Sequence, residues 1–194
     1  NGASSKIAPK IFKMLGADVK AINIKGEINN NCGATHIENL IANMEGFDIG
    51  FSFDGDSDRV ICVDKNKNIF DGDKIIYLLS LYKKKNGEEI HDVVGTVMTN
   101  KKIEELLKEN DINLIRTPVG DKYIIEEMLK NGEKIGGEQA GHIIIGDKHI
   151  TGDGILCAVM LSEIYKEDEK LFEDVVNIKT YPQATEEIKT KNFR

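Results

Sequence analysis

The sequence predicts an α/β protein made of two successive α/β domains, with mixed, largely parallel sheets and helices on both faces. Two observations support this class: short runs of β-branched residues alternate with helical periodicity, and turn residues separate them. Such alternation builds βαβ units. A third observation, the interruption of this rhythm near residues 64–74, predicts a boundary between domains 1–70 and 71–174, with 175–194 as a linker.

The first part of the chain predicts alternating helices and strands. Residues 6–15 carry apolar side chains at helical spacing, with Ser4 or Ser5 as the N-cap and Gly16 as the stop. The next elements are a strand at 18–24, a helix at 35–46 with a capping box from Thr35 to Glu38, and a strand at 47–53.

Later elements continue the pattern. Strands 60–64 and 69–73 flank a polar turn and predict a hairpin, which a helix at 74–85 follows. The remaining elements are a strand at 92–99, a helix at 100–110, a strand at 112–117, a helix at 121–132 closed by Gly132, two short strands within 134–146 and a helix at 154–167.

Composition excludes several classes of protein. The 194 residues are 40% hydrophobic and 30% charged, and no apolar run approaches the roughly 18 residues of a membrane span. We therefore expect a cytoplasmic protein without a membrane partner. The net charge of −7 without a basic stripe or tryptophan argues against nucleic-acid binding. Cys32, Cys62 and Cys157 form no CxxC pair and indicate reduced, structural thiols.

Three aspartates, Asp54, Asp56 and Asp58, alternate with small residues directly after an apolar strand. Carboxylates this close repel one another unless a cation joins them, and oxygen-only ligands favour Mg²⁺ or Ca²⁺. The alternative is a solvated acidic turn whose aspartates bond their own backbone. An EF-hand is excluded, because Arg59 and Lys65 stand where that loop needs glycine and glutamate.

Two further interpretations of this cluster stay open. A haloacid-dehalogenase-type phosphatase also carries D-x-D after a strand, but Asp58 stands where that family has threonine or valine. The guanidinium of Arg59 could orient a carboxylate, grip a phosphate with two hydrogen bonds, or simply neutralise the turn.

The motifs resemble those of the α-D-phosphohexomutase family. "DGDSDR" at 54–59 is similar to its metal loop, D-G-D-G-D-R, and "GEQAGH" at 137–142 to its sugar-recognition loop, G-E-x-S-G-H. "TPVGDKY" at 117–123 resembles the segment between them, and "NCGATH", "VMTN", "TGDG" and "YPQ" extend the resemblance over nearly the whole chain. The glutamine in the sugar loop and the run "VGDKYIIEEM" resemble bacterial members that act on glucosamine phosphates.

The resemblance implies the central part of a four-domain enzyme. Residues 1–70 would be the C-terminal part of domain 2, 71–174 would be domain 3, and 175–194 would lead into domain 4. Domain 1, with the catalytic phosphoserine, and domain 4, with a phosphate-binding loop, would be missing partners on the same polypeptide. We therefore expect the chain alone to be inactive. Ser4 and Ser5 are expected to cap a helix rather than act as nucleophiles.

The implied reaction interconverts glucosamine 6-phosphate and glucosamine 1-phosphate through a phosphoserine and a bisphosphorylated sugar. The resemblance implies Mg²⁺ on Asp54, Asp56 and Asp58, with Arg59 and Lys122 as catalytic residues that hold the phosphate. A phosphomannomutase or phosphoglucomutase of the same family, or a stand-alone module that binds a metal or a sugar phosphate, remains an alternative.

The implied sugar-binding residues are Glu138, Ala140 and His142. The Glu138 carboxylate can accept hydrogen bonds from two neighbouring hydroxyls in either orientation of the sugar. Ala140 replaces the family's serine, and the lost hydroxyl costs on the order of 1 kcal/mol of binding or more. His142 would contact the sugar or brace the loop. Ser57 replaces a glycine of the metal loop, and its side chain is expected to point away from the metal.

Overall fold

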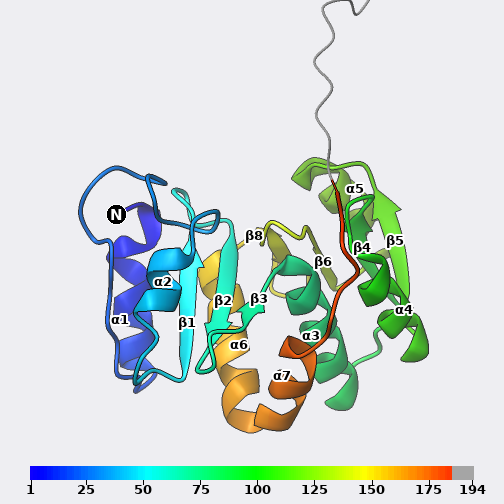
Figure 1. The fold of residues 1–194 in the computed structure, drawn as a ribbon. Coiled ribbons are helices and arrows are strands. Elements are labelled where there is room, and N and C mark those ends of the chain that lie inside the picture. Colours follow the sequence, from blue (N-terminus) through cyan, green and yellow to red (C-terminus); the bar gives the residue numbers. More distant parts are fainter. Residues whose placement is uncertain (185–194) are drawn as a thin grey trace, which may run out of the picture.

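The computed structural model describes residues 1–184 (Figure 1). A three-stranded sheet has the order β1-β2-β3, and a five-stranded sheet has the order β5-β4-β6-β7-β8. The predicted α/β class with mixed sheets is confirmed, but the expectation that the sheets are largely parallel is wrong, because four of the six strand pairs within residues 1–184 are antiparallel. The parallel pairs are β4 with β5 and β4 with β6, and the other neighbouring strands run antiparallel.

The first sheet forms as a meander beside the N-terminal helices. Rings of Phe12 and Phe51 stack with centroids 5.5 Å apart, so the first α-helix packs on the first strand. The last residue pair of the hairpin is Phe53 with Val60, which leaves residues 54–59 as its loop. The elements are η1 (Ala3–Ser5), α1 (Ile7–Met14), α2 (Glu38–Ala42), β1 (Ile49–Phe53), β2 (Val60–Asp64) and β3 (Ile69–Phe70).

The predicted strand at 18–24 is wrong. No strand is assigned there, and Asn23 has a φ of 51°, which interrupts the extended backbone that a ladder requires. The Thr35 to Glu38 capping box is also wrong, because the N-cap position of α2 is Ile37 and its side chain makes no cap hydrogen bond.

The expected serine cap of the first helix is wrong as well. Ser4 and Ser5 lie inside η1, and the N-cap of α1 is Lys6, which makes no side-chain cap hydrogen bond. The hydroxyl of Ser5 donates to the carbonyl of Gly2 at 2.7 Å. Both serines therefore belong to a separate turn that precedes the helix.

The second part of the chain follows the predicted alternation closely. Asn100 caps α4 by accepting from the amide of Lys102 at 3.0 Å, and Gly132 ends α5 with a φ of 80°. β8 and α7 were not predicted. The elements are α3 (Gly72–Lys85), β4 (Asp92–Thr96), α4 (Lys101–Glu109), β5 (Asn113–Thr117), α5 (Asp121–Asn131), β6 (Ile135–Gly137), β7 (Ile143–Ile145), β8 (His149–Gly152), α6 (Gly154–Glu167) and α7 (Glu169–Val176).

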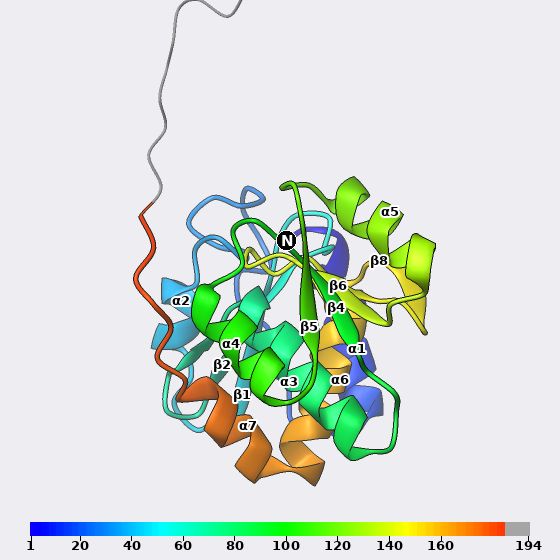
Figure 2. The same cartoon turned by 90° about the vertical axis from the view of Figure 1, so that its right-hand side faces the viewer.

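Helices cover both faces of the second sheet (Figure 2). Val93 belongs to the large core cluster that α3, α4, α6 and α7 share, whereas Val94, the next residue, packs with Ile124 and Met128 of α5. Successive strand residues point to opposite faces, so this alternation places one layer of helices on each side.

The large core cluster runs without interruption from the first sheet into the second. It joins Val60 and Cys62 of β2 to Cys157 of α6 and Phe172 of α7. Cys32, Cys62 and Cys157 are buried and free, which agrees with structural thiols. No helix within residues 1–184 has both the length and the apolarity needed to cross a bilayer.

Candidate metal centre and the adjoining glycine-rich loop

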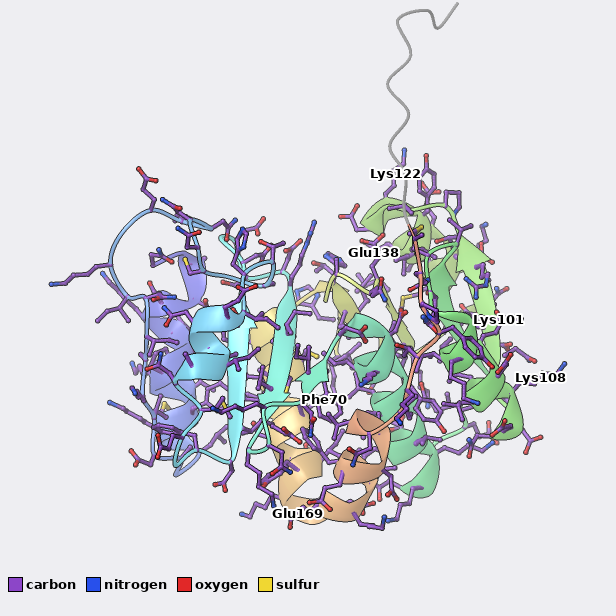
Figure 3. All side chains as sticks on the ribbon, viewed as in Figure 1. Phe70, Lys101, Lys108, Lys122, Glu138 and Glu169 are labelled. Atoms are coloured by element: carbon purple, nitrogen blue, oxygen red, sulfur yellow. The ribbon has the colours of Figure 1, made fainter. Side chains whose placement is uncertain are left out.

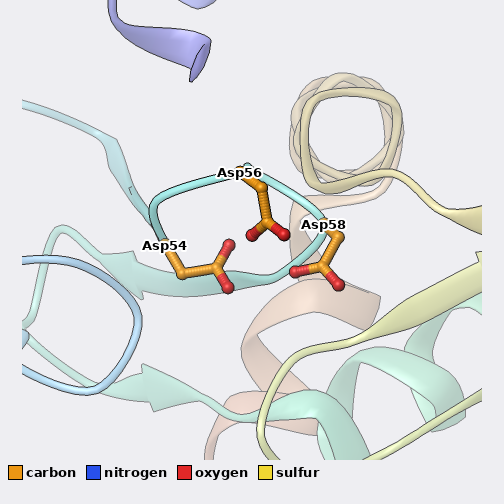
Figure 4. Close-up of side chains that lie close together, drawn as sticks. All are labelled: Asp54, Asp56 and Asp58. Carbon is orange, nitrogen blue, oxygen red and sulfur yellow. The ribbon is translucent and has the colours of Figure 1, made fainter. Parts of the chain in front are cut away.

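The three predicted aspartates lie together in the loop between β1 and β2. One carboxylate oxygen from each of Asp54, Asp56 and Asp58 lies within 4.8 Å of the other two. Figure 4 shows all three side chains directed into the space that the loop encloses. The antiparallel pair of Phe53 and Val60 closes the hairpin and holds both ends of this loop. The structure thus brings the candidate ligands to one point.

Ser57 anchors the loop on its outer side. Its φ of 69° lies in the left-handed region, where glycine is the easier residue. Its hydroxyl accepts a hydrogen bond from the amide of Ser4 at 3.0 Å, and its carbonyl accepts one from Gly154 at 3.0 Å. The hydroxyl is therefore engaged with η1, while the start of α6 holds the backbone of the loop.

The electrostatics of the cluster suit a cation. Burial raises the pKa of Asp54 to about 6; the amide of Arg59 opposes this shift, and the neighbouring Asp58 and Asp56 carboxylates reinforce it. Oδ1 of Asp58 is buried and has no hydrogen-bond partner among residues 1–184. Carboxylates that repel one another, with an oxygen left unpartnered, form a donor set suited to a hard divalent ion.

Arg59 lies against the cluster. Its Nε is 3.7 Å from Oδ2 of Asp54 and 3.9 Å from Oδ1 of Asp58, and its side chain is 40% exposed. These distances are compatible with neutralising or orienting the carboxylates. A grip on phosphate stays a prediction.

The glycine-rich loop at 137–142 contacts the metal-loop hairpin directly. The amide of Val60 donates to the carbonyl of Gly141 at 3.0 Å, and Arg59 forms an isolated antiparallel bridge with His142. Gly141 has a φ of 94°, and a Cβ there would lie 2.4 Å from the carbonyl oxygen of Val60. Glycine at this position therefore permits the close approach of the two loops.

His142 lies beneath the aspartates. Its Nδ1 is 3.0 Å from Oδ2 of Asp58, and the residue is only 4% exposed. The ring packs against Gly152, where a Cβ would lie 2.4 Å from Cε1 of the ring. This geometry supports the bracing alternative, and contact with a sugar stays a prediction.

Glu138 follows β6, and its side chain reaches the start of α5. Its Oε1 accepts a hydrogen bond from the amide of Gly120 at 2.9 Å. A Cβ at Gly72, the first residue of α3, would lie 1.9 Å from the carbonyl oxygen of Glu138, so only glycine fits there. Sequence reasoning missed Gly72, although this glycine stands between Asp71 and Asp73 at a helix start, which is a recognisable signal.

Ala140 and Lys122 are both exposed. The Nζ of Lys122 lies 4.6 Å from the ring centroid of Tyr123, and no ion pair joins Lys122 to the three aspartates in the described part of the chain. Figure 3 shows Lys122 at the outer end of α5, above Glu138 in that view. The structure therefore groups the aspartates with Arg59 and His142, and leaves Lys122 apart from them.

Two domain models of one α/β family match nearly the whole chain. Residues 1–68 match "Phosphoglucomutase/phosphomannomutase, alpha/beta/alpha domain II", and residues 71–181 match domain III of the same family. The chain belongs to the phosphoglucomutase/phosphomannomutase family.

Two curated relatives carry the same name. The phosphoglucosamine mutase of Thermotoga maritima is 45% identical over 194 residues, which cover 97% of this chain and 45% of the relative. That of Thermoanaerobacter sp. is 50% identical over 198 residues, which cover 98% and 44%. The chain thus spans less than half the length of these relatives.

Solved structures share the fold. A phosphoglucomutase/phosphomannomutase family protein from Burkholderia thailandensis superimposes with a TM-score of 0.78 at 21% identity, over 95% of this chain and 41% of that one. An N-acetylphosphoglucosamine mutase from Aspergillus fumigatus, solved with GlcNAc-6P and magnesium, gives 0.66 at 17% identity, over 87% and 46%.

Proposed function

We propose that this chain carries the metal centre and the sugar-recognition loop of a phosphoglucosamine mutase, which interconverts glucosamine 6-phosphate and glucosamine 1-phosphate. The observation that carries the proposal is the direct contact between an aspartate loop and a glycine-rich loop, through Asp58 and His142. Relatives that are 45% and 50% identical over nearly all of the chain support the substrate class.

Mg²⁺ is the proposed cofactor, and Asp54, Asp56 and Asp58 would hold it. The donor set fits, because it contains only carboxylate oxygens and one of them, Oδ1 of Asp58, is buried and accepts no hydrogen bond within residues 1–184. When bound, Mg²⁺ would supply positive charge that stabilises the charge on a transferring phosphoryl group. Arg59 adds a fixed positive charge beside the same carboxylates.

Glu138 is proposed to recognise the sugar. Oε1 of its carboxylate is engaged with Gly120, so the same hydrogen bond that positions Glu138 leaves Oε2 to accept from a sugar hydroxyl. Ala140 offers no hydroxyl in the same loop. Lys122 at the start of α5 is proposed to contact the phosphate. This contact would require the bound ligand or a neighbouring segment to bridge the space between Lys122 and the aspartates.

The domain arrangement is a proposal too. Residues 1–70 and 71–174 would be parts of domains 2 and 3, and the partners would be domains 1 and 4 of a longer polypeptide. α7 continues to Val176, two residues beyond the proposed boundary. The linker proposed for 175–194 lies partly outside the described residues, which end at 184.

The test is a coupled assay with glucosamine, glucose and mannose 6-phosphates, run on the longest polypeptide in which this chain occurs. Preference for glucosamine 6-phosphate, with loss of turnover after chelation of Mg²⁺, is the expected result. Preference for glucose or mannose phosphate would assign another activity within the family. Binding without any turnover would favour a stand-alone binding module.

A further inference from the structure

A side-chain hydrogen bond between Asp58 and His142 joins the metal loop to the glycine-rich loop. We propose that His142 is a positioning residue, which orients Asp58 so that one of its oxygens is presented to the metal ion. The glycine-rich loop would then be part of the metal centre as well as a sugar-binding element. This inference rests on the proposed Mg²⁺ site.

The direction of the hydrogen bond follows from the chemistry of the pair. A carboxylate that binds a metal ion is ionised and only accepts, so in the proposed site Nδ1 of His142 donates to Oδ2 of Asp58 over 3.0 Å. Oδ1 of Asp58 is buried and accepts no hydrogen bond from the described residues, and Nε of Arg59 lies 3.9 Å from it. One oxygen of the carboxylate is therefore held by the histidine, and the other is left for a cation. Hydrogen bonds of this kind orient metal ligands in many sites.

The histidine ring has little freedom to adopt another position. It is 4% exposed, and its Nε2 is buried without a hydrogen-bond partner, so the bond to Asp58 is its polar contact in the described structure. Gly152 of β8 packs against the ring, where any side chain would collide with it. The ring is thus oriented by packing on one side and by the carboxylate on the other.

Backbone contacts hold the two partners at this separation. Arg59, the residue after Asp58, forms a β-bridge with His142, and the amide of Val60 donates to Gly141 at 3.0 Å. The bridge joins the residue next to the ligand directly to the histidine. A change in the glycine-rich loop is therefore transmitted to Asp58 without any intervening flexible segment.

The inference is tested by titrating Mg²⁺ into the 194-residue chain by calorimetry. His142→Phe keeps a ring against Gly152 but removes the donor, and we expect Mg²⁺ to bind at least about ten-fold more weakly. His142→Asn places an amide nitrogen near the position of Nδ1, and we expect binding within about three-fold of the unmodified chain. His149→Ala, at an exposed histidine of β8, is the matched control and should bind normally.

A second readout separates positioning from stability. The melting temperature without metal should stay similar in His142→Phe and His142→Asn, whereas the increase caused by Mg²⁺ should shrink only in His142→Phe. If His142→Phe fails to fold, Gly152→Ala provides the test, because its methyl group would displace the ring and weaken Mg²⁺ binding.

The outcomes distinguish this inference from the proposed function. If the unmodified chain binds Mg²⁺ and folded His142→Phe binds it equally well, the positioning role is wrong and the metal site stands. If the unmodified chain binds no Mg²⁺, the proposed metal site is itself wrong, and the inference falls with it.

Discussion

The amide of Gly120 donates a hydrogen bond to Oε1 of Glu138 over 2.9 Å, so the carboxylate of the glycine-rich loop caps the start of α5. The two residues follow different strands of the second sheet, since Gly120 comes after β5 and Glu138 comes after β6. The proposed sugar-binding residue thus also serves to join two loops.

This double role predicts that the two functions of Glu138 can be separated. Glu138→Gln keeps an oxygen that accepts from Gly120, and should change the free energy of unfolding little. Glu138→Ala leaves that amide unpaired and should lower it by about 1 kcal/mol. Both variants should bind glucosamine 6-phosphate more weakly. Urea unfolding and calorimetry measure the two effects, and equal stability of the two variants would contradict the capping role.

Replacement of the exposed ligand Asp56 should weaken Mg²⁺ binding without unfolding the chain. Asp56→Asn removes one of the three carboxylates whose oxygens lie within 4.8 Å of one another. We expect the affinity for Mg²⁺ to fall by about ten-fold or more. Asp111→Asn changes the net charge equally at a remote, exposed residue. Equal Mg²⁺ affinity in both variants, measured by calorimetry, would mean that the cluster is only an acidic turn.

Asp73 predicts a pH dependence of stability near neutrality. Burial raises its pKa to about 7, Asn100 opposes the shift through its amide, and Asp71 adds to it. The folded chain therefore holds this proton more tightly than the unfolded chain, so the contribution of Asp73 to stability is complete below pH 3.8 and is lost as the pH rises through about 7.

Asp73→Asn should remove this dependence, because an amide oxygen can still accept from Asn100 and no charge has to be buried. The variant should become more stable than the unmodified chain as the pH rises from 5 to 8, by up to about 1.4 kcal/mol for each pH unit. Urea unfolding across that range measures the difference. A constant difference at all pH values would show that Asp73 does not titrate in it.

The buried Lys83 predicts an acid dependence of the opposite sign. Its Nζ lies 3.0 Å from carboxylate oxygens of Glu88 and of Asp147. Burial tends to raise the pKa of both acids, but the lysines outweigh this effect and lower the pKa values; Lys83 contributes most, with Lys134 adding at Glu88 and Lys148 at Asp147. The stability from these pairs is therefore present above their ordinary values of 4.5 and 3.8, and is lost as the pH falls through the lowered values.

Lys83→Met should lower the free energy of unfolding at neutral pH by an amount on the order of 1 kcal/mol, and it should flatten the decline in stability below pH 4.5. Lys148→Met is the matched control, because Lys148 is 57% exposed and lies 3.5 Å from the same Asp147. The control should change little. Similar acid profiles for both variants would contradict the special role of the buried lysine.

Much of the fold could be predicted from the sequence, because its signals are local. The helices from α3 to α6 carry long apolar patterns and recognisable ends, such as Asn100 and Gly132. The strand at 18–24 was predicted from composition alone, yet a strand also needs a partner, which no local pattern reveals. β8 was missed because its four residues are largely exposed and carry no apolar alternation.

The candidate site, like the fold, could be predicted from the sequence only in part. Asp54, Asp56 and Asp58 could be predicted, because they lie within five consecutive positions. The contact between Asp58 and His142 joins residues 84 positions apart, and neither neighbourhood in the sequence encodes it. The resemblance to a family identified the aspartate loop and the glycine-rich loop, but only the structure shows how the two loops contact each other.

The uninterrupted core from β2 to α7 has a consequence for how the chain denatures. Phe70, at the end of the first sheet, and Phe172 of α7 are fully buried, and their ring centroids are 4.2 Å apart. Unfolding of either sheet with its helices would expose apolar surface on the other, so the two sheets should melt in one cooperative transition. Amides of β2 and α6 should accordingly exchange with deuterium at the same slow rate, through global opening.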